Sequence, residues 1–124
     1  LVPPGTASHA AWQPEWATWS QERREARARE LYAAAGHDSE RPLEVELRYN
    51  TSLQNRRLAL AIAQMWRKVL GVRTRLINEE WKVFVVNRRQ GALTQVYRGS
   101  WIADYDDAAS FLGTFVSNQP LNTA

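Results

Sequence analysis

The clearest hydrophobic pattern in the chain is a strict alternation over residues 43–49. Apolar side chains occupy every second position there, and Glu44, Glu46 and Arg48 lie between them. A period of two is typical of a strand with one buried face. Similar alternation over residues 72–77 predicts a second strand, and residues 93–98 predict a third.

The longest helical pattern lies between the first two predicted strands. It opens with Asn50-Thr51-Ser52 and ends at Gly71, a residue that favours a helix stop. Within it the apolar residues recur at helical spacing: Leu58, Ile62, Met65, Trp66 and Val69. This stripe is predicted to be core and not a ligand site.

Three further helices are predicted from caps and stop residues. The pattern Thr18-Trp19-Ser20-Gln21 resembles a capping box and predicts a helix that runs to Gly36. Asn78 is the predicted cap of a helix that ends at Gly91, on which one face carries Trp81, Phe84, Val85 and Arg88. The last predicted helix covers residues 108–116.

Strands that alternate with helices of this length favour parallel pairing through right-handed crossovers. The predicted fold class is therefore α/β, with a small, largely parallel sheet flanked by helices. Charged residues on two of the strands are compatible with two arrangements. Either one face of the sheet is exposed to solvent, or that face is covered by further chain. Residues 1–17, which contain three prolines, are expected to form an extended lead-in to a domain over residues 18–124.

Composition argues against several classes of function. The net charge is +3, but 16 basic residues are interspersed with 13 acidic ones, which favours a mixed solvated surface over a nucleic-acid-binding one. The chain has no cysteine, and no run of about 18 apolar residues that would span a bilayer. His9 and His37 have no patterned catalytic partner, and no glycine-rich phosphate loop is present. We predict no enzymatic activity and no cofactor.

The best candidate site is the run over residues 98–105, where Asp104 lies between Trp101 and Tyr105 just after the third strand. In a parallel sheet the carboxyl ends of the strands share one edge, which brings Asn50-Thr51 and Asn78 towards the same rim. A carboxylate among aromatic rings suits a small cationic group. The alternative is an acid that caps the next helix. Asp104, Asp106 and Asp107 lack EF-hand spacing, so no metal site is predicted.

Several motifs from Trp16 to Asn122 resemble the C-terminal lobe of the periplasmic oligopeptide-binding proteins, the solute receptors of ABC peptide importers. The motifs are Pro14-Glu15-Trp16, Leu47-Arg48-Tyr49-Asn50-Thr51-Ser52, Glu80-Trp81-Lys82, Arg89-Gln90-Gly91 and Gly99-Ser100-Trp101-Ile102-Ala103-Asp104-Tyr105. The resemblance implies a fragment of a two-lobed periplasmic-binding-protein fold, a peptide ligand, a membrane permease as partner and a periplasmic location. It also implies that an N-terminal lobe of the same protein completes the site.

The resemblance implies that Asp104 pairs with the α-ammonium group of a bound peptide. The full set of implied ligand-binding residues is Asp104, Trp101, Ile102, Ser100, Arg98, Arg88 and Trp81. Trp101 and Trp81 could instead be core residues, and Arg98 and Arg88 could instead be surface residues. Arg89 is an alternative to Arg88 as the arginine that matches the family's ligand-binding position. Where family members have a His at the start of the long helix, this chain has Asn55, and Ile102 replaces a Cys found in some relatives.

The leading functional hypothesis is therefore oligopeptide binding for uptake by an ABC transporter. An alternative within the family is a receptor for another amine-bearing solute, such as a murein peptide. From a different class, a small basic nucleic-acid-binding domain is the remaining alternative, favoured only by the basic net charge.

Overall fold

The computed structural model describes residues 2–7, 9–10, 12–91 and 93–117. Its elements in chain order are the 3-10 helix η1 (Glu15–Thr18), α1 (Gln21–Ala34), β1 (Glu44–Asn50), α2 (Leu53–Leu70), β2 (Arg73–Glu79), α3 (Trp81–Gln90), β3 (Val96–Tyr97), α4 (Ala108–Leu112) and the 3-10 helix η2 (Gly113–Phe115). The predicted alternation of helices and strands is confirmed. Residues 118–124, which belong to the predicted domain, lie outside the described residues.

The sheet has the strand order β2-β1-β3, and both pairings are parallel. In the register, Leu47 lies opposite Leu76 on one side and opposite Val96 on the other. Side chains alternate between the two faces of a strand, so these three share a face and Arg48 points to the opposite one. The predicted parallel topology is thus observed, with β1 in the centre.

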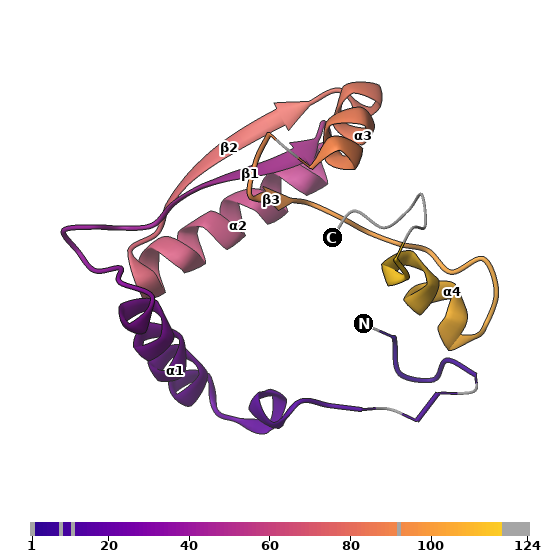
Figure 1. The fold of residues 1–124 in the computed structure, drawn as a ribbon, viewed down its shortest axis with the longest axis horizontal. Helices are drawn as coiled ribbons and strands as arrows, with labels where there is room; N and C mark the ends of the chain where they lie inside the picture. Colours follow the sequence, from indigo (N-terminus) through magenta and orange to yellow (C-terminus); the bar gives the residue numbers. More distant parts are fainter. Residues whose placement is uncertain (1, 8, 11, 92, 118–124) are drawn as a thin grey trace.

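Helix α2 packs on one face of the sheet (Figure 1). The buried cluster on this face consists of Leu47, Tyr49 and Ala59, with Ile62, Leu76 and Val96 packed against it. Gly71 ends the helix in the left-handed conformation, with φ 76°, which glycine adopts without steric cost. The predicted start and stop of this helix are therefore correct, with Ser52 as the cap.

The prediction that the whole apolar stripe of α2 is core is only partly correct. Ile62 packs against the buried cluster, but Met65 is 58% exposed and Leu58 is 48% exposed. The physical reason is the width of the sheet, because three strands cover only a narrow strip of an 18-residue helix.

Helix α3 contacts the opposite face, at the carboxyl ends of the strands. Phe84 is 1% exposed, and its ring lies edge-on to Tyr97 with 6.2 Å between centroids. Tyr97 lies opposite Arg48 in the register, which places both on the face turned away from α2. Towards the amino ends of the strands this face carries two ion pairs, the exposed pair of Arg73 with Glu44 and the pair of Arg75 with the half-buried Glu46. Among the described residues, that part of the face stays charged and open.

Two predicted helix starts are wrong. Helix α1 begins at Gln21 and not at Thr18, because Trp19 is extended, with φ −73° and ψ 153°, and the Ser20 hydroxyl accepts the Arg23 N–H at 3.3 Å. Asn78 does not cap α3, because it stays paired with Tyr49 in the sheet. The cap is Glu80, whose carboxylate accepts the Lys82 N–H at 2.8 Å.

The third strand is shorter than predicted, with only Val96–Tyr97 paired to β1. Side chains take over the pairing on its amino-terminal side. The Thr94 hydroxyl donates to the Glu46 carbonyl at 2.9 Å, and the Gln95 side-chain oxygen accepts the Glu46 N–H at 2.9 Å. Because both backbone groups of Glu46 are satisfied this way, no strand forms there. The last helix is also shorter than predicted and continues as η2.

The N-terminal segment runs back beside α4 (Figure 1). There the Ala7 N–H donates to Asp106 Oδ1 at 3.0 Å, a contact between residues 99 positions apart. The only helical turn described within residues 2–7, 9–10 and 12–17 is η1, which begins at Glu15. The expected lead-in thus reaches the segment that carries Asp104.

Candidate functional site

The carboxyl ends of the parallel strands form one rim, as the topology predicts. Thr51, which follows β1, has its hydroxyl 2.9 Å from both Asn78 Oδ1 and the Glu79 carbonyl oxygen of β2. A hollow of about 340 Å³ opens at this rim, lined by Tyr49, Thr51, Ser52, Leu53, Arg56 and Asn78. The predicted meeting of Asn50-Thr51 with Asn78 is therefore confirmed.

The loop after β3 continues from this rim. The Arg98 N–H donates to the Arg48 carbonyl at 2.8 Å, which extends the sheet pairing by one residue. Beyond it, the loop is tied to Ser110 of α4, which is 6% exposed. The Trp101 indole N–H donates to the Ser110 carbonyl at 2.7 Å, and the Asp104 N–H donates to the Ser110 hydroxyl at 3.0 Å.

Ser110 is a residue that the sequence analysis missed. A serine in a helix carries no signal of its own, and its role depends on a loop six to nine residues earlier in the chain. The arrangement fixes the backbone at Asp104 and the ring of Trp101 together. The loop is therefore held at both of the positions that the sequence singled out.

Three acids follow each other closely in this loop, and they have different surroundings. The Asp107 carboxylate caps α4 by accepting the Ala109 N–H at 2.7 Å, and Asp106 accepts the N–H of Ala7. Asp104 is exposed, and its carboxylate makes no hydrogen bond or ion pair with the described part of the chain. The helix cap that competed with a binding role is thus supplied by Asp107, not by Asp104.

The neighbours of Asp104 in the loop are also open to solvent. Ile102 is 87% exposed and Trp101 is 39% exposed, and Ser100 is exposed as well. An indole fixed by its N–H and left partly uncovered offers flat apolar area with little rotamer freedom to lose. A free carboxylate on the same loop as such a ring can bind a small cation, such as an ammonium group.

Two arginines lie near the start of this loop. Arg98 is half-buried, and its Nε is buried without a hydrogen-bond partner among the described residues. Arg88, in α3, is half-buried too, and a Cβ placed on Gly99 would lie 3.5 Å from its Nη2 atom. Arg89 is exposed. Of the two competing arginines in α3, it is therefore Arg88 whose guanidinium lies against the loop.

The remaining predicted residues divide. Trp81 is 56% exposed at the start of α3, and its ring stacks on that of Phe84 with 6.2 Å between centroids. The Trp81 ring therefore contacts a core residue and is also open to solvent. Asn55 is buried, and its amide donates to the Asn50 carbonyl at 3.2 Å and to Asn50 Oδ1 at 3.0 Å. The Asn55 amide N–H is thus committed to the end of β1.

A buried polar network lies beneath α3 and was not predicted. Glu79 forms an ion pair with Arg48, and their side chains are only 10% and 15% exposed. The Asn87 amide of α3 donates to Glu79 Oε1 at 2.8 Å, and the Tyr97 hydroxyl donates to the Asn87 carbonyl at 3.1 Å. Charged residues on the strands were visible in the sequence, but which of them meet across the sheet depends on the register.

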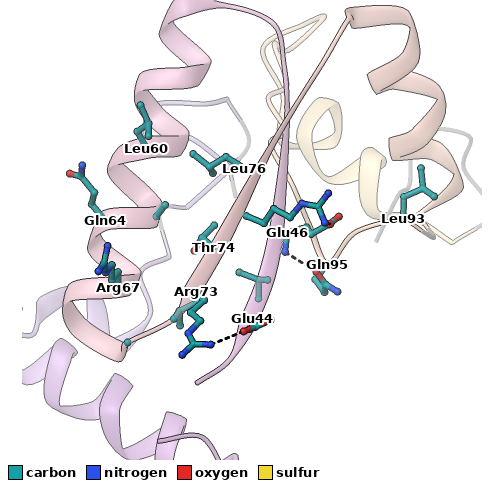
Figure 2. Close-up of a pocket in the computed structure, with 15 residues that line it drawn as sticks. Glu44, Glu46, Leu60, Gln64, Arg67, Arg73, Thr74, Leu76, Leu93 and Gln95 are labelled. Atoms are coloured by element: carbon teal, nitrogen blue, oxygen red, sulfur yellow. Dashed lines mark hydrogen bonds and ion pairs between the residues drawn. The ribbon is translucent and has the colours of Figure 1, made fainter. Parts of the chain in front are cut away.

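A larger hollow of about 1070 Å³ lies along the edge strand β2 and around the amino-terminal half of the sheet (Figure 2). Figure 2 shows Leu60, Gln64 and Arg67 of α2 on one side of β2, with Gln95 and Leu93 across the sheet. It lies at the end of the sheet opposite the Asp104 loop, and charged pairs such as Arg73 with Glu44 are exposed there. We do not assign it to ligand binding.

No described helix is long and apolar enough to cross a membrane. No group of three or more His, Cys, Asp or Glu side chains gathers there in a way that would hold a metal ion.

Comparison with known proteins identifies the class. A model of the family described as bacterial extracellular solute-binding proteins, family 5 Middle, matches residues 1–123. The chain belongs to this family. The α/β prediction, with a parallel sheet inside a periplasmic-binding-protein fold, is confirmed by the solved structures that it resembles.

Individual relatives show how much of a full protein the chain represents. It is 45% identical over 123 residues to the periplasmic oligopeptide-binding protein OppA of Escherichia coli K12, covering 99% of this chain and 22% of that protein. The solved structure of the Escherichia coli murein tripeptide binding protein MppA matches with a TM-score of 0.92 and 37% identity, over 98% of this chain and 24% of that one. Haemophilus influenzae OppA, solved in complex with RPPGFSPFR, matches with a TM-score of 0.86 and 33% identity, over 90% of this chain and 22% of that one. The chain thus spans about a fifth of the length of these relatives, which are named as binding proteins and not as enzymes.

Proposed function

We propose that this chain is part of the C-terminal lobe of an oligopeptide receptor, and that Asp104 anchors the α-ammonium group of the bound peptide. The observation that carries the proposal is the free carboxylate of Asp104. The carboxylates of its two neighbours, Asp106 and Asp107, each accept a backbone N–H, whereas Asp104 is exposed and its carboxylate is bonded to none of the described residues. A fixed backbone with an unoccupied carboxylate suits a ligand.

The neighbouring residues complete the proposed anchor. Trp101 lines the cleft beside the ammonium group, and Ser100 and Ile102 are presented on the same exposed loop. The bound ligand would exclude water from this loop, which strengthens a charge-assisted hydrogen bond to Asp104. An α-ammonium group is common to all unblocked peptides, so this anchor alone tolerates any sequence.

Three further residues are proposed to contact the rest of the peptide. Arg98 and Arg88 lie at the start of the loop, where a guanidinium can meet a ligand carboxylate or an acidic side chain. Trp81 offers an exposed ring on α3. Affinity would otherwise come from the peptide backbone, which presents the same donors and acceptors whatever its side chains.

The relatives' names support the wider setting. OppA of Escherichia coli is named a periplasmic protein, and we infer the same compartment for this chain. In the intact receptor, residues 18–124 would belong to one lobe, residues 1–17 would lead into it, and an N-terminal lobe of the same protein would close over the peptide. The partner is an ABC importer permease. No enzymatic step, cofactor or nucleic acid enters the proposal.

The test compares Asp104→Ala with wild-type intact receptor by titration calorimetry, with alanine peptides of two to five residues. Loss of a charge-assisted hydrogen bond worth about 1.5–3 kcal/mol weakens binding by roughly ten- to a hundredfold. N-acetylation of the peptide is expected to weaken its binding to the wild type by a similar factor. It should hardly weaken binding to Asp104→Ala, which has already lost the anchor. Asp106→Asn, two positions away, is the matched control and should leave affinity unchanged. Equal binding of free peptide by wild type and Asp104→Ala would rule out the anchor.

Murein peptides are a second candidate ligand, favoured by the match to the murein tripeptide binding protein. Titration of free alanine peptides against cell-wall peptides separates the two. Both ligand types carry an amine, so an effect of Asp104→Ala is expected with either.

A further inference from the structure

The polar network beneath α3 ties that helix to two strands at once. Asn87 donates from its side chain to Glu79 at the end of β2, and its backbone carbonyl accepts from the Tyr97 hydroxyl of β3. Both contacts are part-buried, where a hydrogen bond is stronger than one exposed to water, and the contact with Glu79 has a charged acceptor as well. Together with the buried Phe84, Asn87 therefore fixes how far α3 is rotated relative to the sheet.

The next residue in the helix is Arg88, whose guanidinium lies against Gly99 at the start of the Asp104 loop. A rotation of α3 would move this group first, because Arg88 has a long side chain on the same turn as Asn87. Among the described residues, no hydrogen bond or ion pair joins the side chain of Arg88 itself to the sheet, whereas Asn87 makes two such hydrogen bonds. Its position thus depends on the contacts of its neighbour.

The charge of Glu79 makes the contact with Asn87 specific. Glu79 neutralises Arg48, and its Oε1 atom accepts from both Arg48 and Asn87. Its Oε2 atom is buried and has no partner among the described residues. A carboxylate so enclosed loses its main compensating contacts if either donor is removed.

We propose that Asn87 and Glu79 act as a positioning pair for ligand binding. The pair sets the orientation of α3 and thereby holds Arg88 where it meets the carboxylate of a bound peptide. This inference rests on the proposed function, and it adds two residues that touch no ligand themselves.

The experiment uses the intact receptor and the alanine peptides named above. Asn87→Ala is expected to weaken binding about tenfold, the lower end of the range for loss of a hydrogen bond to a charged group, because the lost bond positions Arg88 and does not itself contact the ligand. Gln90→Ala, an exposed residue on the same helix, is the control and should bind as the wild type does. Circular dichroism and the melting temperature without ligand establish that each variant is folded at the assay temperature.

Two further measurements distinguish positioning from a general loss of stability. If Asn87 acts through Arg88, then Asn87→Ala adds no further loss in an Arg88→Ala background. The double variant Glu79→Gln with Asn87→Asp exchanges donor and acceptor and keeps the net charge. It is expected to restore affinity to within about threefold of the wild type. The amide now at position 79 would donate to the carboxylate now at position 87.

Additive losses for Asn87→Ala and Arg88→Ala would overturn the inference, as would unchanged affinity for Asn87→Ala or for Arg88→Ala. Failure of the exchanged pair to recover binding in a folded receptor would overturn it as well. These outcomes are independent of the Asp104 test. A receptor whose wild type binds no free peptide, or binds equally with Asp104→Ala, contradicts the proposed function instead.

Discussion

Ser110→Ala tests whether the loop after β3 must be held in place for ligand binding. Ser110 is buried in α4, and its hydroxyl accepts the Asp104 N–H at 3.0 Å. The Trp101 indole bonds to the backbone carbonyl of the same residue, so alanine keeps that contact. The substitution therefore releases the backbone of Asp104 and little else.

The magnitude follows from two opposing effects. An N–H left without its acceptor in a part-buried place costs about 1–3 kcal/mol. Alanine is the better helix former and returns up to about 0.5 kcal/mol in α4. The free energy of unfolding should therefore fall by about 0.5–3 kcal/mol. Peptide affinity should fall by roughly tenfold, because the anchor carboxylate then has to be ordered by the ligand.

The assay has two readouts on the intact receptor, urea unfolding without ligand and calorimetric titration with alanine peptides. Ser39→Ala, in the exposed loop before β1, is the matched control and should change neither. A variant that loses stability but binds peptide with wild-type affinity would refute the idea that Ser110 orders the anchor. Unchanged stability would refute the bond itself.

Two more predictions concern the scaffold. Phe84→Ala should lower the free energy of unfolding by about 3–5 kcal/mol, measured by urea denaturation, since Phe84 is the fully buried side chain between α3 and Tyr97. A loss under about 1 kcal/mol would contradict this packing. The backbone N–H groups of Arg41 and then Glu40 lower the pKa of Asp38 below its ordinary value of 3.8. Its stabilising effect is therefore present above that value and is lost as the pH falls through the lowered pKa. Asp38→Asn should flatten the acid limb of a plot of unfolding midpoint against pH, and an unchanged limb would count against the contact.

Much of the fold could be predicted from local patterns. The alternation over residues 43–49 identified the central strand, and the helical stripe that ends at Gly71 identified α2, because burial of one face imposes these periods. The predicted helix starts at Thr18 and Asn78 were wrong, because several neighbouring polar residues could cap each helix. Ser20 and Glu80 have the extended backbone and the free side chain that a cap requires, whereas Asn78 remains paired in β2.

The sequence by itself determined the class of fold, the family and the place of Asp104 after the third strand. These depend on residues near one another in the chain, or on short motifs that can be recognised in the sequence alone. Only the tertiary structure decided that Asp107 caps α4 and leaves Asp104 free, that Ser110 holds the loop, and that Asn87 meets Glu79. The meeting of Asn87 with Glu79 depends on how α3 packs against the paired strands. The Asp107 cap and the bond from Asp104 to Ser110 join residues two and six positions apart, but which of the neighbouring acids and hydroxyls form them depends on the path of the loop from β3 to α4.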